Sequence, residues 1–183
     1  MGRVIGIDFG TTASCIAVST NGGEPELKTF GQTGSRLPSA VSVVSATEFL
    51  VGDLALNSAR ANPERFEATP KQWISRDEPY VIFSDGLTVE TIDLVAAVLR
   101  KLFDSIGGLE RGDCIAATHP VTWVEQQLDV LRDAFRKLGG SWEPELISEP
   151  EAAAWGAIEQ SEREPGARYC IFDWGGGTLD TAV

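Results

Sequence analysis

The sequence is poor in the residues that bind transition metals. It contains one histidine, His119, and three widely spaced cysteines in 183 residues, with no CxxC or HExxH spacing. A metal site made of several histidines or paired cysteines is therefore excluded. The cysteines are Cys15, Cys114 and Cys170, and each lies in an apolar run. We expect them to be reduced thiols in the core rather than redox or disulfide cysteines.

Positive charge is also scarce. Lysine and arginine number 15 against 27 aspartates and glutamates, so the formal net charge is −12. Such a surface has little electrostatic attraction for the negatively charged phosphate backbone of a nucleic acid, and we expect no nucleic-acid partner. No apolar run approaches the about 20 residues of a membrane helix, and the start, MGRVIGIDFG, lacks a secretory signal. We expect a cytoplasmic protein with no membrane partner.

The sequence does have the composition of a folded domain, with alternating strand and helix patterns. Hydrophobic residues make up 43% and charged residues 23% of the chain, close to globular averages. Short β-branched runs predict strands at residues 3–9, 14–19, 26–30, 114–118, 145–147 and 168–173. Helical spacing of apolar residues predicts helices over 53–60, 88–106, 124–138 and 148–159. Residues 62–80 have no clear period. This order predicts an α/β fold in which helices flank a mixed β-sheet.

Two segments place an aspartate and a glycine-containing turn directly after an apolar strand. The first is IDFGTT, residues 7–12, and the second is FDWGGGT, residues 172–178. Glycines let backbone N–H groups approach phosphate oxygens closely, and threonine hydroxyls add donors. The strand-end carboxylates, Asp8 and Asp173, can hold Mg²⁺ directly or through water. Either turn alone is also ordinary hairpin chemistry, but the pair predicts two loops that clamp a phosphate group.

These segments resemble the heat-shock 70 kDa chaperones of the DnaK type, within the actin-like ATPase superfamily. IGIDFGTTASCIAV is similar to the first phosphate loop of that family, and FDWGGGTLDTAV is similar to its second. Between them, VGDLALNSARANPERF followed by Lys71 resembles the segment with the active-site lysine, and ISEPEAAAWGA resembles the glutamate-proline helix start. The order and spacing match along the whole chain.

The resemblance implies the N-terminal lobe of an actin-like, ribonuclease H-like ATPase domain. Residues 1–37 and 114–183 would form the phosphate-side core subdomain, and residues 38–113 would be an inserted α+β subdomain. The second lobe, which binds adenosine, and the peptide-binding domain would lie outside these 183 residues. The chain also stops within a predicted apolar strand, at residues 179–183. For both reasons we expect it to be a piece of a longer protein.

The resemblance also implies roles for individual residues. The phosphate-binding residues would be Gly10, Thr11, Thr12, Gly175, Gly176, Gly177 and Thr178. The catalytic residues would be Lys71, Glu149, Thr178 and Asp173, and Asp8 and Asp173 would hold Mg²⁺, through water. For Lys71 the alternative is a solvated surface lysine. For Glu149 it is an acidic residue that merely suits the first turn of a helix.

The function implied is ATP binding and hydrolysis with Mg²⁺, which drives the handling of unfolded client proteins, together with co-chaperones, in the full-length protein. The 183 residues alone would bind ATP weakly, turn over negligibly and self-associate through exposed apolar surface. Two alternatives stay open at this point. One is a sugar or metabolite kinase of the same superfamily, and the other is an actin-like scaffold protein switched by nucleotide.

Overall fold

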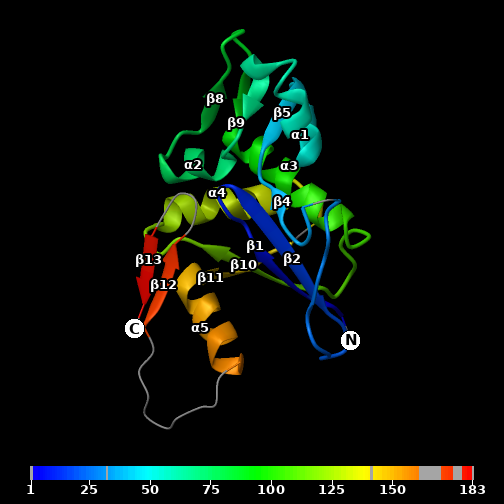
Figure 1. Ribbon diagram of the computed structural model, residues 1–183, viewed down its shortest axis with the longest axis vertical. Helices are drawn as coiled ribbons and strands as arrows, with labels where there is room; N and C mark the ends of the chain where they lie inside the picture. The colour runs from blue at the N-terminus through cyan, green and yellow to red at the C-terminus, as the bar shows by residue number, and fades with distance from the viewer. Residues whose placement is uncertain (1, 32, 141, 161–169, 175–178, 183) are drawn as a thin grey trace.

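A mixed β-sheet forms the centre of the fold. The computed structural model describes residues 2–31, 33–140, 142–160, 170–174 and 179–182. The strands of the central sheet lie in the order β11-β10-β1-β2-β3, and β4 pairs with the start of β2 (Figure 1). Their bounds are Val4–Asp8 for β1, Ala13–Ser19 for β2, Glu26–Leu27 for β3, Leu37–Pro38 for β4, Cys114–His119 for β10 and Glu145–Ser148 for β11. β1 runs antiparallel to β2 and parallel to β10, and β10 runs parallel to β11.

One face of this sheet is apolar and buried by two helices. Side chains alternate across a strand, so every second residue of β1, β2 and β10 points to the same face. The buried set on this face is Ile5, Ile7, Ile16, Val18, Ile115 and Ala117. These residues belong to the same core cluster as the buried faces of α3, Thr91–Asp104, and α4, Glu125–Arg136. α3 and α4 also pack against each other.

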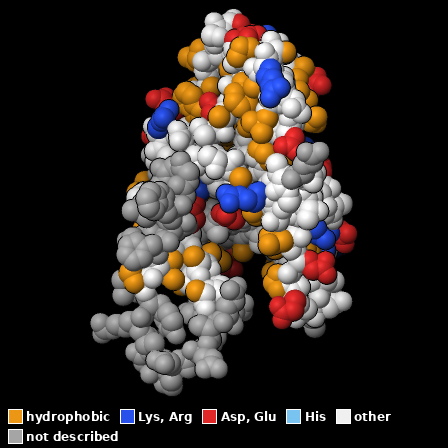
Figure 2. Space-filling model, in the orientation of Figure 1, with side chains coloured by type: hydrophobic (Ala, Val, Ile, Leu, Met, Phe, Trp, Pro, Cys, Tyr) orange, Lys and Arg blue, Asp and Glu red, His pale blue; other side chains and the backbone are white. Residues whose placement is uncertain are grey.

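The opposite face is made of small and polar residues and is more open. It includes Gly6, Asp8, Ala17 and Ala116, which are exposed or only half-buried. α5, Glu149–Gln160, contacts β10 and β11, and Figure 1 places it on the side of the sheet away from α4. Figure 2 shows the molecule hollowed at its lower end, between α5 and the strands β1 and β2.

The chain leaves the central sheet after β4 and returns at β10. Between them it forms smaller sheets and helices, which occupy the upper half of Figure 1 together with α3. β5 pairs with β6 and β7, and β8 pairs with β9, all antiparallel. The bounds are β5 Val41–Ser45, β6 Glu48–Val51, α1 Asp53–Ser58, the 3-10 helix Pro63–Arg65, β7 Phe66–Glu67, α2 Pro70–Ser75, β8 Tyr80–Ile82 and β9 Thr88–Glu90.

The α/β class and the mixed sheet flanked by helices are confirmed. The strand predicted over residues 26–30 is shorter, because a turn follows it in which the Thr33 hydroxyl donates to the Phe30 carbonyl oxygen at 2.7 Å. β12, Ile171–Trp174, pairs antiparallel with β13, Leu179–Ala182, in a separate two-stranded sheet. The turn between them, residues 175–178, lies outside the described residues.

The expectation of core cysteines is wrong for two of the three. All three thiols are free, but Cys114 and Cys170 are exposed and Cys15 is half-buried. In β10 the buried positions are Ile115 and Ala117, so Cys114 lies on the outer side of the strand. An apolar run does not by itself say which of its residues face inward.

Within the described ranges, no helix combines the length and the apolar character needed to cross a bilayer.

Candidate functional site

The first predicted phosphate loop is the tight connection between β1 and β2. A Cβ atom at Gly10 would lie 2.1 Å from the carbonyl oxygen of Ala13, so the turn has room only for glycine here. Of the two threonines in the loop, Thr11 is half-buried and Thr12 is exposed. The loop therefore leaves its hydroxyl groups near the surface while its backbone is held close to β2.

A buried serine braces this loop from behind. The Ser39 hydroxyl donates to the Gly10 carbonyl oxygen at 2.8 Å, and the Ser39 backbone N–H donates to the Thr12 carbonyl oxygen at 3.0 Å. The Ser14 hydroxyl lies 2.9 Å from the Ser39 hydroxyl oxygen. Because the single Ser39 hydroxyl proton goes to Gly10, Ser14 is the donor in this contact. Both serines are fully buried, so the loop carbonyl groups are satisfied without water.

Asp8 ends β1 at the open face of the sheet. Its carboxylate is exposed and accepts a hydrogen bond from the Thr118 hydroxyl at 2.9 Å. It borders a pocket of about 270 Å³ that also contains Gly6, Cys15, Ala17 and Ala152. Burial, and then the Asp8 charge, raise the pKa of the Cys15 thiol, so this thiol is protonated at neutral pH.

Lys71 and Glu149 are 78 positions apart in the sequence and lie in direct contact. Lys71 is the second residue of α2, and Glu149 is the first residue of α5, directly after β11. The Lys71 Nζ atom donates to Glu149 Oε1. Only 3% of Lys71 is exposed, so it is not a solvated surface lysine.

Two aromatic rings surround the Lys71 ammonium group. Its Nζ atom lies 5.8 Å from the centroid of the Phe9 ring and 5.6 Å from that of Trp123. Phe9 directly precedes Gly10, so the ammonium group lies beside the first loop. A buried charge needs compensation by an opposite charge or by hydrogen bonds. Glu149 supplies the opposite charge, and the two ring faces add cation–π attraction.

The second predicted loop is described only in part. Gly175, Gly176, Gly177 and Thr178 lie outside the described residues. Asp173 is in β12, where it pairs with Asp180 of β13. α5, which begins with Glu149, contacts both strands of this hairpin as well as β10 and β11 of the central sheet (Figure 1). The helix with the predicted catalytic glutamate therefore adjoins both strands of the second loop, and it contacts β10, the neighbour of β1 in the central sheet.

The residues present fit a phosphate group and a water-coordinated ion. Within the described part of the chain, no three histidine, cysteine or acidic side chains come together to hold a metal directly. A single exposed carboxylate, Asp8, at the end of β1 instead suits Mg²⁺ bound through water. The tight turn at Gly10 and the threonines beside it offer donors to phosphate oxygens.

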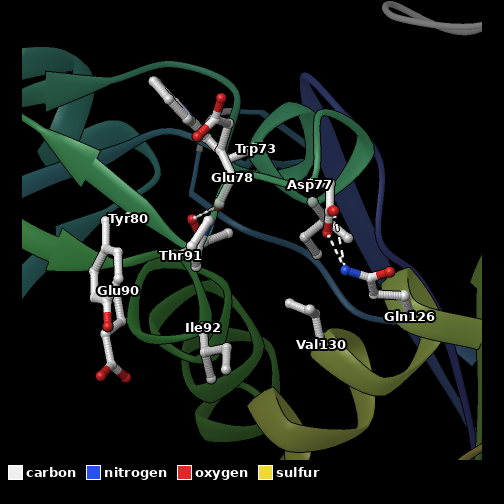
Figure 3. A pocket seen from close by; sticks show the side chains of 11 residues that line it. Trp73, Asp77, Glu78, Tyr80, Glu90, Thr91, Ile92, Gln126 and Val130 are labelled. Carbon is white, nitrogen blue, oxygen red and sulfur yellow. Dashed lines mark hydrogen bonds between the residues drawn. The ribbon is translucent and has the colours of Figure 1, made fainter.

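A larger cavity lies away from these residues. It has a volume of about 440 Å³ and is formed by α2, the segment after it, and the starts of α3 and α4. Figure 3 shows Gln126 directed at Asp77, and its amide nitrogen donates to both carboxylate oxygens at 2.9 Å. The Thr91 hydroxyl donates to the Glu78 carbonyl oxygen at 2.6 Å. None of the predicted site residues that the structure describes lines this cavity, and its hydrogen bonds join the segment after α2 to α4 and to α3.

Ser39, Phe9 and Trp123 were not predicted as site residues. Phe9 is part of the apolar run 3–9, which indicates a core residue and nothing more. Ser39 and Trp123 lie in irregular segments, and only the tertiary fold brings them to the loop and to Lys71. For Lys71 a local signal existed, because Pro70 at the first helical position is typical of a helix start.

One comparison bears on this site. Residues 4–85 match the family model described as Hsp70 protein. The matched segment runs from the start of β1 to the turn between β8 and β9, so it includes Asp8, the first loop and Lys71. Glu149 and Asp173 follow it in the sequence.

Proposed function

We propose that the chain is the N-terminal part of a chaperone ATPase domain, because residues 4–85 match the family model described as Hsp70 protein. In the full-length protein this domain binds ATP or ADP with Mg²⁺ and hydrolyses ATP. The family implies an actin-like ATPase fold, with which the mixed α/β sheet agrees.

The observation that carries the proposal is the Lys71–Glu149 pair beside the first loop. Hydrolysis of a phosphoanhydride requires positioning, charge neutralisation and an oriented water rather than a covalent step. Lys71 would neutralise charge on the terminal phosphoryl group. Glu149, which holds the Lys71 ammonium group, would orient the attacking water or accept its proton.

The loops would bind the rest of the phosphate chain. Backbone N–H groups at Gly10 and the hydroxyl groups of Thr11 and Thr12 would donate to phosphate oxygens, and residues 175–178 would do so from the other side. Asp8 and Asp173 would hold Mg²⁺ through its water ligands. The bound nucleotide supplies the phosphoanhydride bond, and the ion supplies positive charge beside it.

The cellular role follows from the family. We propose that ATP turnover drives binding and release of unfolded client peptides by a part of the protein outside these residues, with co-chaperones as further partners. A cytoplasmic location and a role in the stress response belong to the same proposal. The proposed ATPase domain would have two subdomains here. Residues 1–37 and 114–183 would form the phosphate-side core, and residues 38–113 would form the inserted subdomain.

The two alternatives receive less support. A sugar kinase of the same superfamily would use an aspartate as base for a hydroxyl group, whereas the acid that pairs with Lys71 is the half-buried Glu149. A nucleotide-switched scaffold would need surfaces that polymerise on ATP binding. Sedimentation with and without Mg·ATP would reveal such polymers.

The test uses charge-neutral variants of the pair in the full-length protein. We expect Lys71→Met and Glu149→Gln each to lower the rate of ATP hydrolysis about 100-fold or more, with ATP affinity largely retained. The control is Lys101→Met, because Lys101 is an exposed lysine on α3.

Each single variant removes one charge of this pair and keeps the other, which destabilises folding by about 3–5 kcal/mol. The double variant Lys71→Met with Glu149→Gln removes both charges and keeps the fold testable if a single variant unfolds. Unchanged hydrolysis in a folded double variant would overturn the catalytic assignment.

A further inference from the structure

The Lys71 ammonium group is enclosed on two sides by aromatic faces. Its Nζ atom lies within 6 Å of the centroids of both rings, at 5.6 Å from Trp123 and 5.8 Å from Phe9. Both aromatic residues are buried, with 7% of Trp123 and 0% of Phe9 exposed. The rings therefore take positions that water would occupy around a surface lysine.

Such an enclosure compensates a buried cation while restricting where it can lie. An ammonium group has three donors, and the Glu149 carboxylate accepts from it on one side. The negative faces of the aromatic rings attract the cation on the other sides, and this attraction is stronger where water is absent. A flexible lysine side chain is thereby confined to one place beside the first loop.

Trp123 is itself oriented by the helix that carries Lys71. Its indole N–H donates to the Ser75 hydroxyl oxygen at 3.0 Å. The Ser75 hydroxyl in turn donates to the Lys71 carbonyl oxygen at 3.4 Å. One chain of hydrogen bonds thus connects the ring that faces the ammonium group with the backbone of the same lysine.

We propose that Trp123 and Phe9 are positioning residues that hold the Lys71 ammonium group at the first loop. The enclosure stands on the geometry alone, and its effect on ATP turnover rests on the proposed function. Trp73, on the same helix as Lys71, is the matched control for Trp123, because its ring makes other contacts. Its indole N–H donates to Glu67 Oε2 at 2.7 Å, and its ring lies 5.8 Å from the Arg76 guanidinium carbon.

The first test is a nuclear magnetic resonance measurement on the 183-residue chain labelled at lysine. The sequence has four lysines, Lys28, Lys71, Lys101 and Lys137, so the Lys71 signals can be assigned by substitution. Protons over an aromatic face are shifted upfield by the ring current. We expect the ε protons of Lys71 to lie upfield of those of the other three lysines.

The variants separate the ring face from general packing. Trp123→Phe should keep most of the upfield shift, because it keeps an aromatic face, whereas Trp123→Leu should lose the part that the indole causes and keep the part that Phe9 causes. The control Trp73→Leu should leave the Lys71 signals unchanged. An unchanged Lys71 shift in folded Trp123→Leu would overturn the proposal. If that variant does not fold, Ser75→Ala is the decisive variant, because it frees the indole, and an unchanged Lys71 shift in it would overturn the proposal.

The second test measures ATP hydrolysis by the full-length protein. We expect Trp123→Leu to lower kcat about tenfold with a smaller change in KM, and Trp123→Phe to restore most of the loss. A lost ring-current shift together with unchanged kcat would reject the positioning role while leaving the enclosure intact. If Lys71→Met also leaves kcat unchanged, Lys71 has no role in hydrolysis. That result would contradict the proposed function, but it would not contradict the enclosure of Lys71 by the two rings.

Discussion

Arg3 joins the first strand to the end of α3 and to the turn before β10. Its guanidinium group donates to the carbonyl oxygens of Ile106 at 3.0 Å and Gly108 at 2.7 Å, and to Asp113 Oδ2 at 2.7 Å. The carbonyl groups that follow the last turn of a helix have no partners within it. Arg3 satisfies two of them, so this residue fixes the connection by which the chain returns to the central sheet.

The partner of Arg3 makes folding stability depend on pH. Burial by itself raises the pKa of the Asp113 carboxyl, but hydrogen bonds from Arg3 and from the Glu110 backbone N–H outweigh it, and the pKa lies below its ordinary value. A carboxyl with a lower pKa in the folded state stabilises the fold above its unfolded pKa. It loses that contribution as the pH falls through the folded value.

We therefore expect the free energy of unfolding to decrease as the pH falls below about 4. Asp113→Asn should flatten this dependence and should also lower stability at pH 7, because the exposed Glu110, 3.8 Å from the guanidinium group, is then the carboxylate that Arg3 keeps in this turn. Urea unfolding at pH 7 and at pH 3 measures both effects. Asp129→Asn, at an exposed ion pair with Arg132, is the control. An equally steep pH dependence in Asp113→Asn would contradict this account.

Ser39 should determine how firmly the first loop is held. Ser39→Ala leaves the Gly10 carbonyl oxygen and the Ser14 hydroxyl without their buried partner, which costs about 1–3 kcal/mol. Hydrogen exchange should become faster at the amides of residues 10–12. Ser45→Ala, at an exposed serine of β5, should leave these rates unchanged. Exchange rates at the loop that do not respond to Ser39→Ala would show that the loop is held by other contacts.

At the scale of elements, α3 joins the central sheet to the smaller sheets. Its apolar positions recur at helical spacing, and residues such as Leu94, Leu99 and Leu102 are fully buried. This period predicted the helix correctly over residues 88–106, with ends only two or three residues from the observed Thr91–Asp104. A long helix with one buried face is predictable because each of its turns needs an apolar residue on that face, so apolar residues recur at helical spacing.

A core substitution in α3 should destabilise the whole fold. Leu99 has no exposed surface, and its replacement by alanine removes buried methyl groups and leaves a cavity. We expect Leu99→Ala to lower the free energy of unfolding by about 2–5 kcal/mol. Thermal or urea unfolding measures the change, and Arg100→Ala on the exposed face of the same helix is the control. A loss as small as that of the control would mean that α3 does not pack into the core.

α2 could not be predicted in the same way. It spans only Pro70–Ser75, which is too short for an apolar period to be recognised. Its side chains serve several different contacts, since Lys71 pairs with Glu149, Trp73 with Glu67, and Ser75 with Trp123. The irregularity predicted for residues 62–80 reflects these contacts, because no single buried face dictates the pattern.

At the scale of the whole molecule, the sequence indicated individual candidate residues but not how the fold would bring them together. The motifs around Asp8, Lys71 and Glu149 could be recognised from residue types and order. Nothing in the local pattern indicated that Lys71 would be buried beside two aromatic rings and paired with Glu149. That pairing depends on α2 and α5 meeting across the end of the sheet, and such long-range contacts leave no period in a sequence.

The open face of the sheet has a consequence for nucleotide binding. In the proposed function the first loop and Asp8 would contact phosphate and ion from one side, and α5 covers this face only in part. A nucleotide held by half of its contacts stays largely in water and gains little binding free energy. We therefore expect the 183 residues to bind Mg·ATP far more weakly than a form that continues through the second lobe.

Calorimetric titration of Mg·ATP and Mg·ADP into both forms tests the central claim most directly. We predict one tight nucleotide site in the long form, little or no heat from the short form, and loss of binding when Thr11 and Thr12 are both replaced by valine in the long form. Absence of binding in the long form, or binding that is unaffected by the threonine substitutions, would contradict the assignment of a nucleotide site to this loop.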